Sequence, residues 1–190
     1  MTTSAKVSIV SNVIALGALA MAWFTAPLPL YFSYPVHKLL HLVGVMMFFG
    51  NLVAGPVWLA VALFEKDRPH FAFAAKTLAD LDMYLTTPGV QLAVWNGLCL
   101  ASVFGGVRAQ PWLVEAVAMM VFTSLFSVTV VLHWQEKLVA AALENDWPKT
   151  KRAMTWWSVF GTLVGVPLAL VMYLMVSKQA LWLTLTPPPP

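Results

Sequence analysis

Long apolar runs, separated by short polar connections, dominate the chain from end to end. A transmembrane helix needs roughly 20 mostly apolar residues, and five runs approach or exceed that length. The pattern therefore predicts an all-α integral membrane helical bundle with five transmembrane helices, folded as one transmembrane domain over residues 1–190. These helices are expected at residues 7–24, 36–64, 88–106, 111–134 and 154–176.

The composition agrees with this interpretation. Hydrophobic residues make up 60% of the chain, charged residues only 10%, and the mean hydropathy is +0.78, whereas soluble domains carry about 25% charged residues. The net charge of +3 is spread along the connections, which argues against a nucleic-acid-binding surface. The single cysteine, Cys99, excludes a disulfide within the chain, and the sequence contains no nucleotide-binding or hydrolase motif.

Two further stretches mix charged and apolar residues at helical spacing. Residues 69–84 and 135–145 are predicted to form interfacial helices at the membrane surface. The first apolar run contains Ala18-Leu19-Ala20, which resembles a signal-peptide cleavage site. We nevertheless expect this run to be retained as the first transmembrane helix.

The lysine and arginine residues predict the orientation. Cytoplasmic connections carry an excess of these residues, and a cytoplasmic N-terminus satisfies this rule, because it places eight of them inside and three outside. We therefore expect a multi-pass protein of the bacterial inner membrane with a cytoplasmic N-terminus and a periplasmic C-terminus. The tail Pro187–Pro190 then lies outside. The residues expected outside are Lys38, Arg108 and Lys178.

The strongest candidate site lies at the start of the second run. His37 and His41 are four residues apart, so they share one face of a helix, and Lys38 lies beside them. Ionisable groups in a membrane helix are costly and indicate function by default. The same face continues with small and polar residues, which also favours a plain helix-packing surface. Its further members are Gly44, Phe48, Asn51 and Gly55.

A carboxylate is expected at a similar depth. His41 lies roughly 8 Å below the start of its helix, and Glu115 lies roughly 6 Å below the start of the fourth helix, both counted from the outer side. Glu115 could orient the His41 ring or exchange a proton with it. His133 lies roughly 33 Å down the fourth helix, and together with His70 it leaves open a second, inner site.

Several short motifs are spread over residues 36–178. They are Lys38-Leu39-Leu40-His41, Phe48-Phe49, Pro56, Leu85-Thr86-Thr87-Pro88, His133 and Met175-Val176-Ser177-Lys178. These motifs are similar to those of HemJ-type protoporphyrinogen oxidases and of the copper-resistance D membrane domain, and the chain looks closest to an uncharacterised membrane family related to both. The resemblance implies a four-helix core, here with an added N-terminal helix, and a b-type haem for which His41 is the best ligand position.

The chain also departs from this pattern at polar positions. An arginine after the family proline is Val57 here, a lysine is Glu115, and an asparagine-glutamate pair is Val164-Gly165. The polar groups that this chain lacks are the ones expected to bind a porphyrin carboxylate or to transfer a proton. Their loss weighs against porphyrin oxidation but leaves haem or metal binding open.

The leading hypothesis from the sequence is therefore a haem protein that serves in electron transfer or a haem-linked redox reaction. Haem b would be held by His41, with His37 and Glu115 around it, and Lys38 or Arg108 would pair with a propionate. The first alternative is a non-catalytic accessory subunit of a larger respiratory or photosynthetic membrane complex. A further alternative is a copper site using His37 and His41. The sequence does not decide whether the protein is an enzyme.

Overall fold

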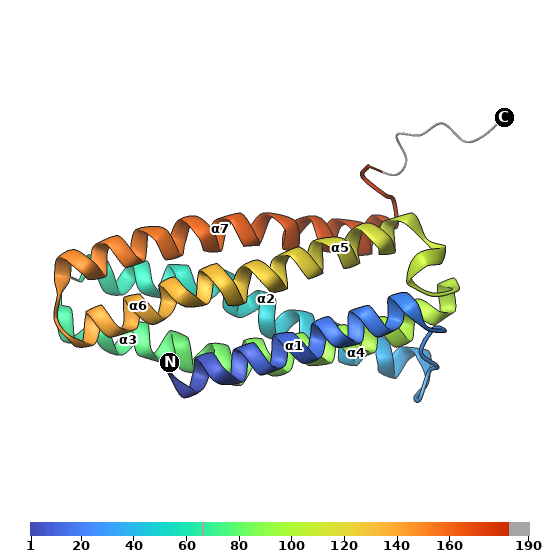
Figure 1. The fold of residues 1–190 in the computed structure, drawn as a ribbon, viewed down its shortest axis with the longest axis horizontal. Coiled ribbons are helices and arrows are strands. Elements are labelled where there is room, and N and C mark those ends of the chain that lie inside the picture. The colour runs from blue at the N-terminus through green and yellow to red at the C-terminus, as the bar shows by residue number, and fades with distance from the viewer. Residues whose placement is uncertain (66, 183–190) are drawn as a thin grey trace.

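The computed structural model describes residues 1–65 and 67–182, so the predicted outer tail Pro187–Pro190 lies outside the described residues. Within the described ranges the fold is all-helical and contains no strand. The long helices run side by side along the length of the molecule (Figure 1). The α-helices are α1 (Thr3–Phe24), α2 (Tyr34–Phe64), α3 (Arg68–Leu81), α4 (Thr87–Ala101), α5 (Pro111–Phe126), α6 (Leu132–Leu143) and α7 (Trp147–Ser177).

Two pairs of helices follow each other without a break. The π-helical turn η1 (Asp82–Thr86) joins α3 to α4, and the π-helical turn η4 (Ser127–Val131) joins α5 to α6. In each turn a backbone N–H bonds the carbonyl five residues earlier: Thr87 to Asp82, and Leu132 to Ser127. The segments predicted as interfacial helices, 69–84 and 135–145, are therefore continuous with bundle helices. Their depth in the membrane stays a prediction.

The sequence explains one of these π turns. Pro88 is the second residue of α4, so it has no N–H to donate to the preceding turn, and its ring crowds the carbonyl there. A wider turn relieves that crowding. π turns are rare and often mark functional sites. The two π turns, η1 and η4, therefore indicate where a functional site is expected in this bundle.

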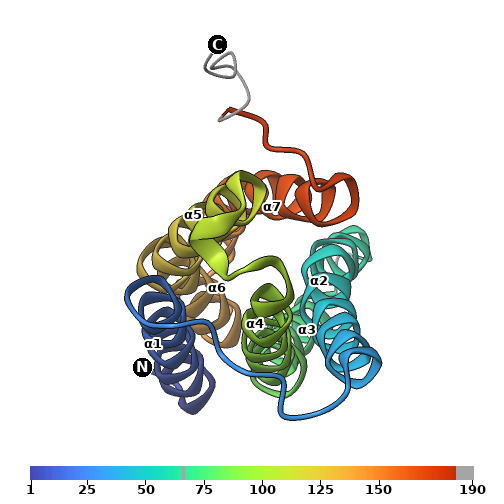
Figure 2. The same cartoon turned by 90° about the vertical axis from the view of Figure 1, so that its right-hand side faces the viewer.

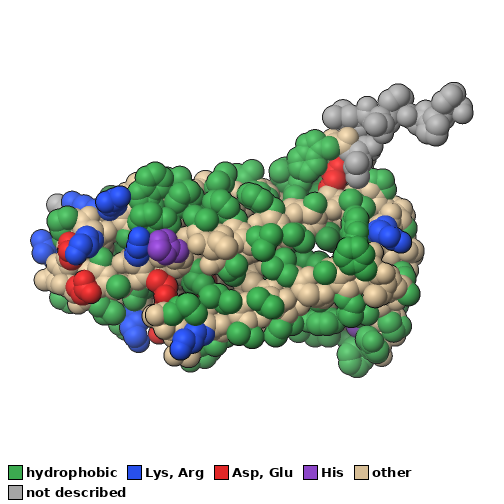
Figure 3. Space-filling model, viewed as in Figure 1, with side chains coloured by type: hydrophobic (Ala, Val, Ile, Leu, Met, Phe, Trp, Pro, Cys, Tyr) green, Lys and Arg blue, Asp and Glu red, His purple; other side chains and the backbone are tan. Residues whose placement is uncertain are grey.

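Among residues 1–65 and 67–182, four helices are long and apolar enough to cross a membrane, namely α1, α2, the α5–α6 run and α7. The fifth predicted crossing, residues 88–106, is helical as α4 up to Ala101, but α4 carries Gln91 and Asn96, which lower its hydropathy. Five crossings and the cytoplasmic N-terminus remain predictions. Charged side chains gather at one end of the molecule, and apolar side chains cover its middle (Figure 3). We call the end where α2 and α6 finish the charged end.

The opposite end of the bundle holds the starts of α2 and α5, and we call it the Glu115 end after a residue of α5. The end-on view shows α5, α6 and α7 on one side and α1, α2, α3 and α4 on the other (Figure 2). α2 packs on α3 and α4, while α7 packs on α5 and α6.

The buried core is divided along this length. One apolar cluster at the Glu115 end joins α1, α4, α5 and α7, and another at the charged end joins α2, α3, α6 and α7. Between them lies only a small cluster of four buried residues: Phe48, Ala93, Val164 and Leu168. The middle of the bundle is thus its least filled part.

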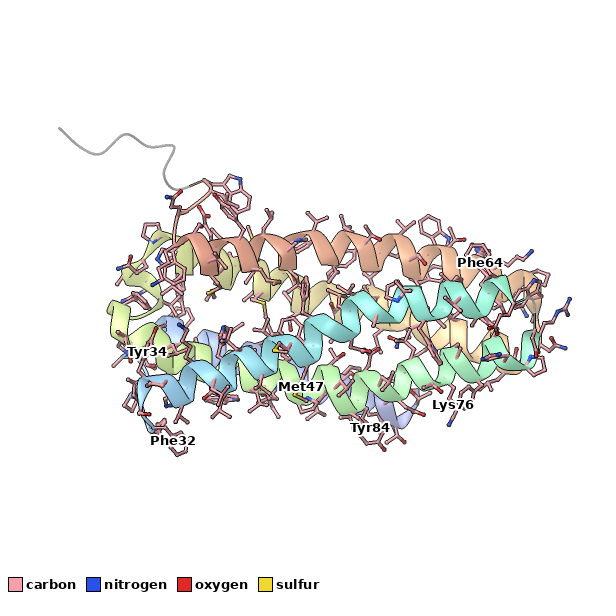
Figure 4. All side chains as sticks on the ribbon, turned by 180° about the vertical axis from the view of Figure 1, so that it is seen from behind. Phe32, Tyr34, Met47, Phe64, Lys76 and Tyr84 are labelled. Carbon is pink, nitrogen blue, oxygen red and sulfur yellow. The ribbon has the colours of Figure 1, made fainter. Side chains whose placement is uncertain are left out.

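α2 and α4 approach each other closely because both carry glycine at the crossing. A Cβ added to Gly44 would lie 2.5 Å from the backbone nitrogen of Ala93, and one added to Gly89 would lie 2.8 Å from that of Phe48. Further along, α2 bends beyond Met47 (Figure 4). Pro56 lies inside this helix and cannot donate a backbone hydrogen bond, which accounts for the bend.

Candidate functional site

A cavity of about 460 Å³ occupies the middle of the bundle, and we call it the central cavity. Pockets of roughly 300–1,000 Å³ are typical of small-molecule sites. It is lined mainly by apolar residues of α2 and α7, and residues of both π turns, η1 and η4, also line it. The polar residues that line it are Ser8, Ser11, Asn12, Asn51, Asp82, Thr86, Thr87, Ser127, Gln135, Ser158 and Thr162.

Asp82 is the one ionisable side chain among the described residues that line this cavity. Its Oδ1 accepts hydrogen bonds from Asn51 Nδ2 at 2.8 Å and from Thr86 Oγ1 at 2.9 Å. Its Oδ2 accepts one from Gln135 Nε2 at 2.5 Å. Three elements, α2, η1 and α6, therefore converge on one carboxyl group.

No lysine, arginine or histidine forms an ion pair with Asp82 in the described part of the chain. A carboxylate has room for about four hydrogen-bond donors, and three are supplied here. An isolated buried charge is strongly disfavoured, so such a group takes up a proton or meets a cation. The arrangement suits a site where a proton or a cationic group compensates the carboxylate.

The side of α7 that lines the cavity is built from small residues. Four small residues lie on this side of the helix, each three or four positions from two of the others: Ser158, Gly161, Thr162 and Gly165. A Cβ added to Gly161 or Gly165 would meet nothing within 4 Å. These glycines therefore leave space beside α7 that a larger side chain would fill.

The two predicted histidines have different surroundings. His37 is buried, its Nδ1 bonds Asn96 Oδ1 at 2.8 Å, and its Nε2 accepts the N–H groups of Tyr31 and Phe32 at 3.1 Å. Both ring nitrogens of His37 therefore hold the connection before α2 against α4. A metal ion at His37 would have to displace one of these contacts.

His41 is half-buried and uses one ring nitrogen within the chain. Its Nδ1 bonds the carbonyl oxygen of Ala93 at 2.7 Å, so that nitrogen carries the proton, because a carbonyl only accepts. The free electron pair of the ring is then on Nε2. This is the arrangement in which histidines commonly ligate metals.

Glu115 and His41 have different hydrogen-bond partners among the described residues. Glu115 is buried, and its carboxylate oxygens accept the backbone N–H groups of Leu181 at 2.6 Å and Trp182 at 2.7 Å. It therefore holds the segment after α7 against the start of α5. The other predicted site residues, Lys38 and Arg108, are exposed at the same end.

The inner site of His70 and His133 is not assembled around one point. His70 Nδ1 lies 2.7 Å from Glu65 Oε2, and His133 packs edge-on against Trp134. Both side chains are exposed. In the described residues no group of three or more histidine, cysteine or acidic side chains is placed to hold a metal ion.

Comparison with known protein families decides the family. A model described as a predicted integral membrane protein, DUF2269, matches residues 35–179. The chain belongs to the DUF2269 family. This match spans α2 to the end of α7, as the core of residues 36–178 predicted, and leaves α1 outside. It does not show a relationship to HemJ-type oxidases or the copper-resistance D domain. No curated protein and no solved structure matches the chain significantly.

The DUF2269 match includes all four residues of the hydrogen-bonded group around Asp82, while Ser8, Ser11 and Asn12 belong to the added helix α1. Sequence reasoning missed Asp82 because its neighbours made residues 69–84 resemble a surface helix. One usable signal was present: Asp82 and Thr86 are four residues apart, directly before an apolar run that begins with Pro88.

Proposed function

We propose that this integral membrane protein binds a small amphiphile from the bilayer in the central cavity. The polar part, an amine or another donor-rich or cationic group, contacts Asp82, and the apolar part lies between α2 and α7. One observation carries the proposal: a largely apolar cavity in the middle of a membrane bundle is lined by a carboxyl group that has no cationic side-chain partner among the described residues.

The shape of the cavity supports a ligand that enters from the side. Residues 49–56 of α2 and 157–169 of α7 form its two long walls, and these helices belong to different packing groups of the bundle. Because both walls are mainly apolar, a hydrocarbon chain fits between them with little desolvation cost. Asp82, Asn51 and Gln135 supply the few polar contacts that fix the orientation of a bound molecule.

The proposal predicts that Asp82→Asn releases a co-purifying amphiphile. Wild type and variant would be purified in mild detergent, extracted with organic solvent and compared by mass spectrometry. Asparagine keeps the size and a hydrogen-bonding carbonyl but cannot carry the negative charge. We expect an amine- or guanidine-bearing amphiphile enriched at least tenfold over detergent blanks in wild type and lost in the variant. Equal amounts in both would contradict a role for Asp82.

A haem-linked function is the second candidate, and the orientation of His41 favours it. Nε2 of His41 is available as an axial ligand, and Lys38 and Arg108 lie at the same end. His41 does not line the central cavity, because the α2 part of the lining begins at Phe49, about 12 Å along the helix from His41. A haem bound by His41 would therefore not lie in this cavity. The copper and accessory-subunit hypotheses gain no comparable support from the contacts of the described residues.

The haem candidate predicts a visible absorption spectrum. The purified protein, oxidised and then reduced with dithionite, would show a Soret band and sharp reduced α and β bands, and His41→Ala would abolish them. His133→Ala is the matched control, because that exposed histidine lies at the start of α6, roughly 33 Å along the α5–α6 run from Pro111 at the Glu115 end. A flat spectrum with an empty pyridine haemochrome assay would remove this candidate.

A further inference from the structure

A second, smaller cavity lies between Asp82 and the charged end of the bundle. Its volume is about 20 Å³, and a site of roughly 10–15 Å³ is enough for one water molecule. Polar side chains are unusually frequent around it, which suits a water with several partners. Those polar residues are Thr2, Ser4, Ser8, Asp82, Gln135 and Glu136.

Ser8 connects this small cavity to the larger one. It lines both cavities, and so do Asp82, Leu132 and Gln135. Ser4, Ser8 and Asn12 follow each other at four-residue spacing, so they form one face of α1. Polar groups therefore line α1 from its first turn, which lies on the side of the charged end, into the middle of the bundle (Figure 1).

Glu136 lies at the outer end of this route. Its side chain is 26% exposed, and its Oε1 accepts the backbone N–H and the hydroxyl of Thr2, both at 2.7 Å. Among the described residues that line the two cavities, Asp82 and Glu136 are the ionisable ones. α2 faces Asp82 with the neutral Asn51 and α6 with the neutral Gln135, and the neutral Ser8 of α1 lines both cavities together with Asp82. Two ionisable groups act on Glu136: the N-terminal ammonium, whose nitrogen lies 3.9 Å from Glu136 Oε2, and His133.

The polar face of α1 does not continue toward the Glu115 end. Beyond Asn12, the inner face of α1 continues with Ala15, Ala18, Leu19 and Ala22, which are all buried. These residues belong to the apolar cluster of the Glu115 end together with Leu98 and Leu174. A water chain through this packed apolar region would lack polar partners.

We propose that Asp82 exchanges its proton with the aqueous phase at the charged end, through the small cavity past Glu136, and not with the opposite phase. A proton from that phase moves onto the Asp82 carboxylate and leaves it neutral, and the reverse transfer restores the charge. The consequence for binding rests on the proposed function: the protonated site no longer attracts a cationic group, so release of the amphiphile is coupled to the pH on one side of the membrane.

Infrared spectroscopy of oriented proteoliposomes tests this access directly. The carboxylic acid C=O band of Asp82 is identified by its loss in Asp82→Asn. We expect the band to grow when the pH is lowered at the charged end and to stay unchanged when only the opposite phase is acidified. A band that follows the opposite phase, or that responds to neither, would overturn the proposal. The readout does not require the amphiphile, so its failure is distinguishable from failure of the proposed function.

Two variants at Ser8 test the route itself. Ser8→Leu fills the junction between the cavities, and we expect the band to respond at least tenfold more slowly to a pH change at the charged end. Ser8→Ala removes the hydroxyl but leaves the space for water, and its response is expected to stay within about twofold of wild type. Equal rates for the leucine and alanine variants would place proton access elsewhere, whatever the stability of either variant.

Discussion

Replacing Gly44 by alanine is expected to destabilise the bundle by about 1–3 kcal/mol, the range found when atoms are forced into packed cores. The new Cβ would lie 2.5 Å from the backbone nitrogen of Ala93 and 2.6 Å from the carbonyl oxygen of Gly89. Backbone atoms cannot rotate aside as a flexible side chain can, so α2 and α4 must separate. Unfolding in detergent, followed by circular dichroism over a denaturant series, measures the change.

Gly50→Ala is the matched control for this prediction. Gly50 lies on the same helix, but a Cβ added there meets nothing within 4 Å. Alanine favours a helix over glycine by about 1 kcal/mol, so this variant is expected to be as stable as wild type or slightly more stable. If both alanine variants showed the same stability, the close α2–α4 crossing would not be the contact that holds these helices together.

Replacing Asp82 by alanine is expected to cost about 2–5 kcal/mol of stability, because each buried donor left without an acceptor costs about 1–3 kcal/mol. The hydrogen bonds lost are those from Asn51 Nδ2, Thr86 Oγ1 and Gln135 Nε2. Thr86 Oγ1 and Gln135 Nε2 lose their acceptor, whereas Asn51 Nδ2 keeps Thr86 Oγ1 as a second acceptor at 2.9 Å. Since these hydrogen bonds come from three elements, the loss loosens the middle of the bundle. The same denaturant series measures this change.

Asp82→Asn separates this structural role from the ligand-binding role. Its amide oxygen accepts from Asn51 and Thr86, and Gln135 can turn its own amide to present an oxygen. We therefore expect the asparagine variant to unfold within about 1 kcal/mol of wild type while losing the bound amphiphile. An alanine variant as stable as wild type would contradict the structural importance of the hydrogen bonds to Asp82.

The all-helical fold was predictable from the sequence because apolar length and proline positions are local signals. The stripe predicted on α2 is buried at five of its six positions, His37, Gly44, Phe48, Asn51 and Gly55, while His41 is half-buried. Three-four spacing identifies the face that contacts protein. It does not identify the neighbour, which is why α4 as the partner of Gly44 became visible only in the structure.

The candidate site depended on contacts that spacing cannot predict. Asn51 and Gln135 are 84 residues apart and meet only through Asp82. Glu115 was expected beside His41 at equal depth, but the N–H groups of Leu181 and Trp182 occupy its oxygens. Equal depth places two residues at one level of the bundle without bringing their helices together.

A comparison of Gly161→Leu with Gly50→Leu tests most directly whether an amphiphile binds in the central cavity. Both positions have room for a larger side chain, but only Gly161 lines the central cavity. Native mass spectrometry from detergent would count the amphiphile molecules bound to each variant and to wild type. We expect Gly161→Leu to lose the bound molecule and Gly50→Leu to retain it as wild type does. Retention by Gly161→Leu, or no bound amphiphile on wild type, would contradict binding of an amphiphile in this cavity.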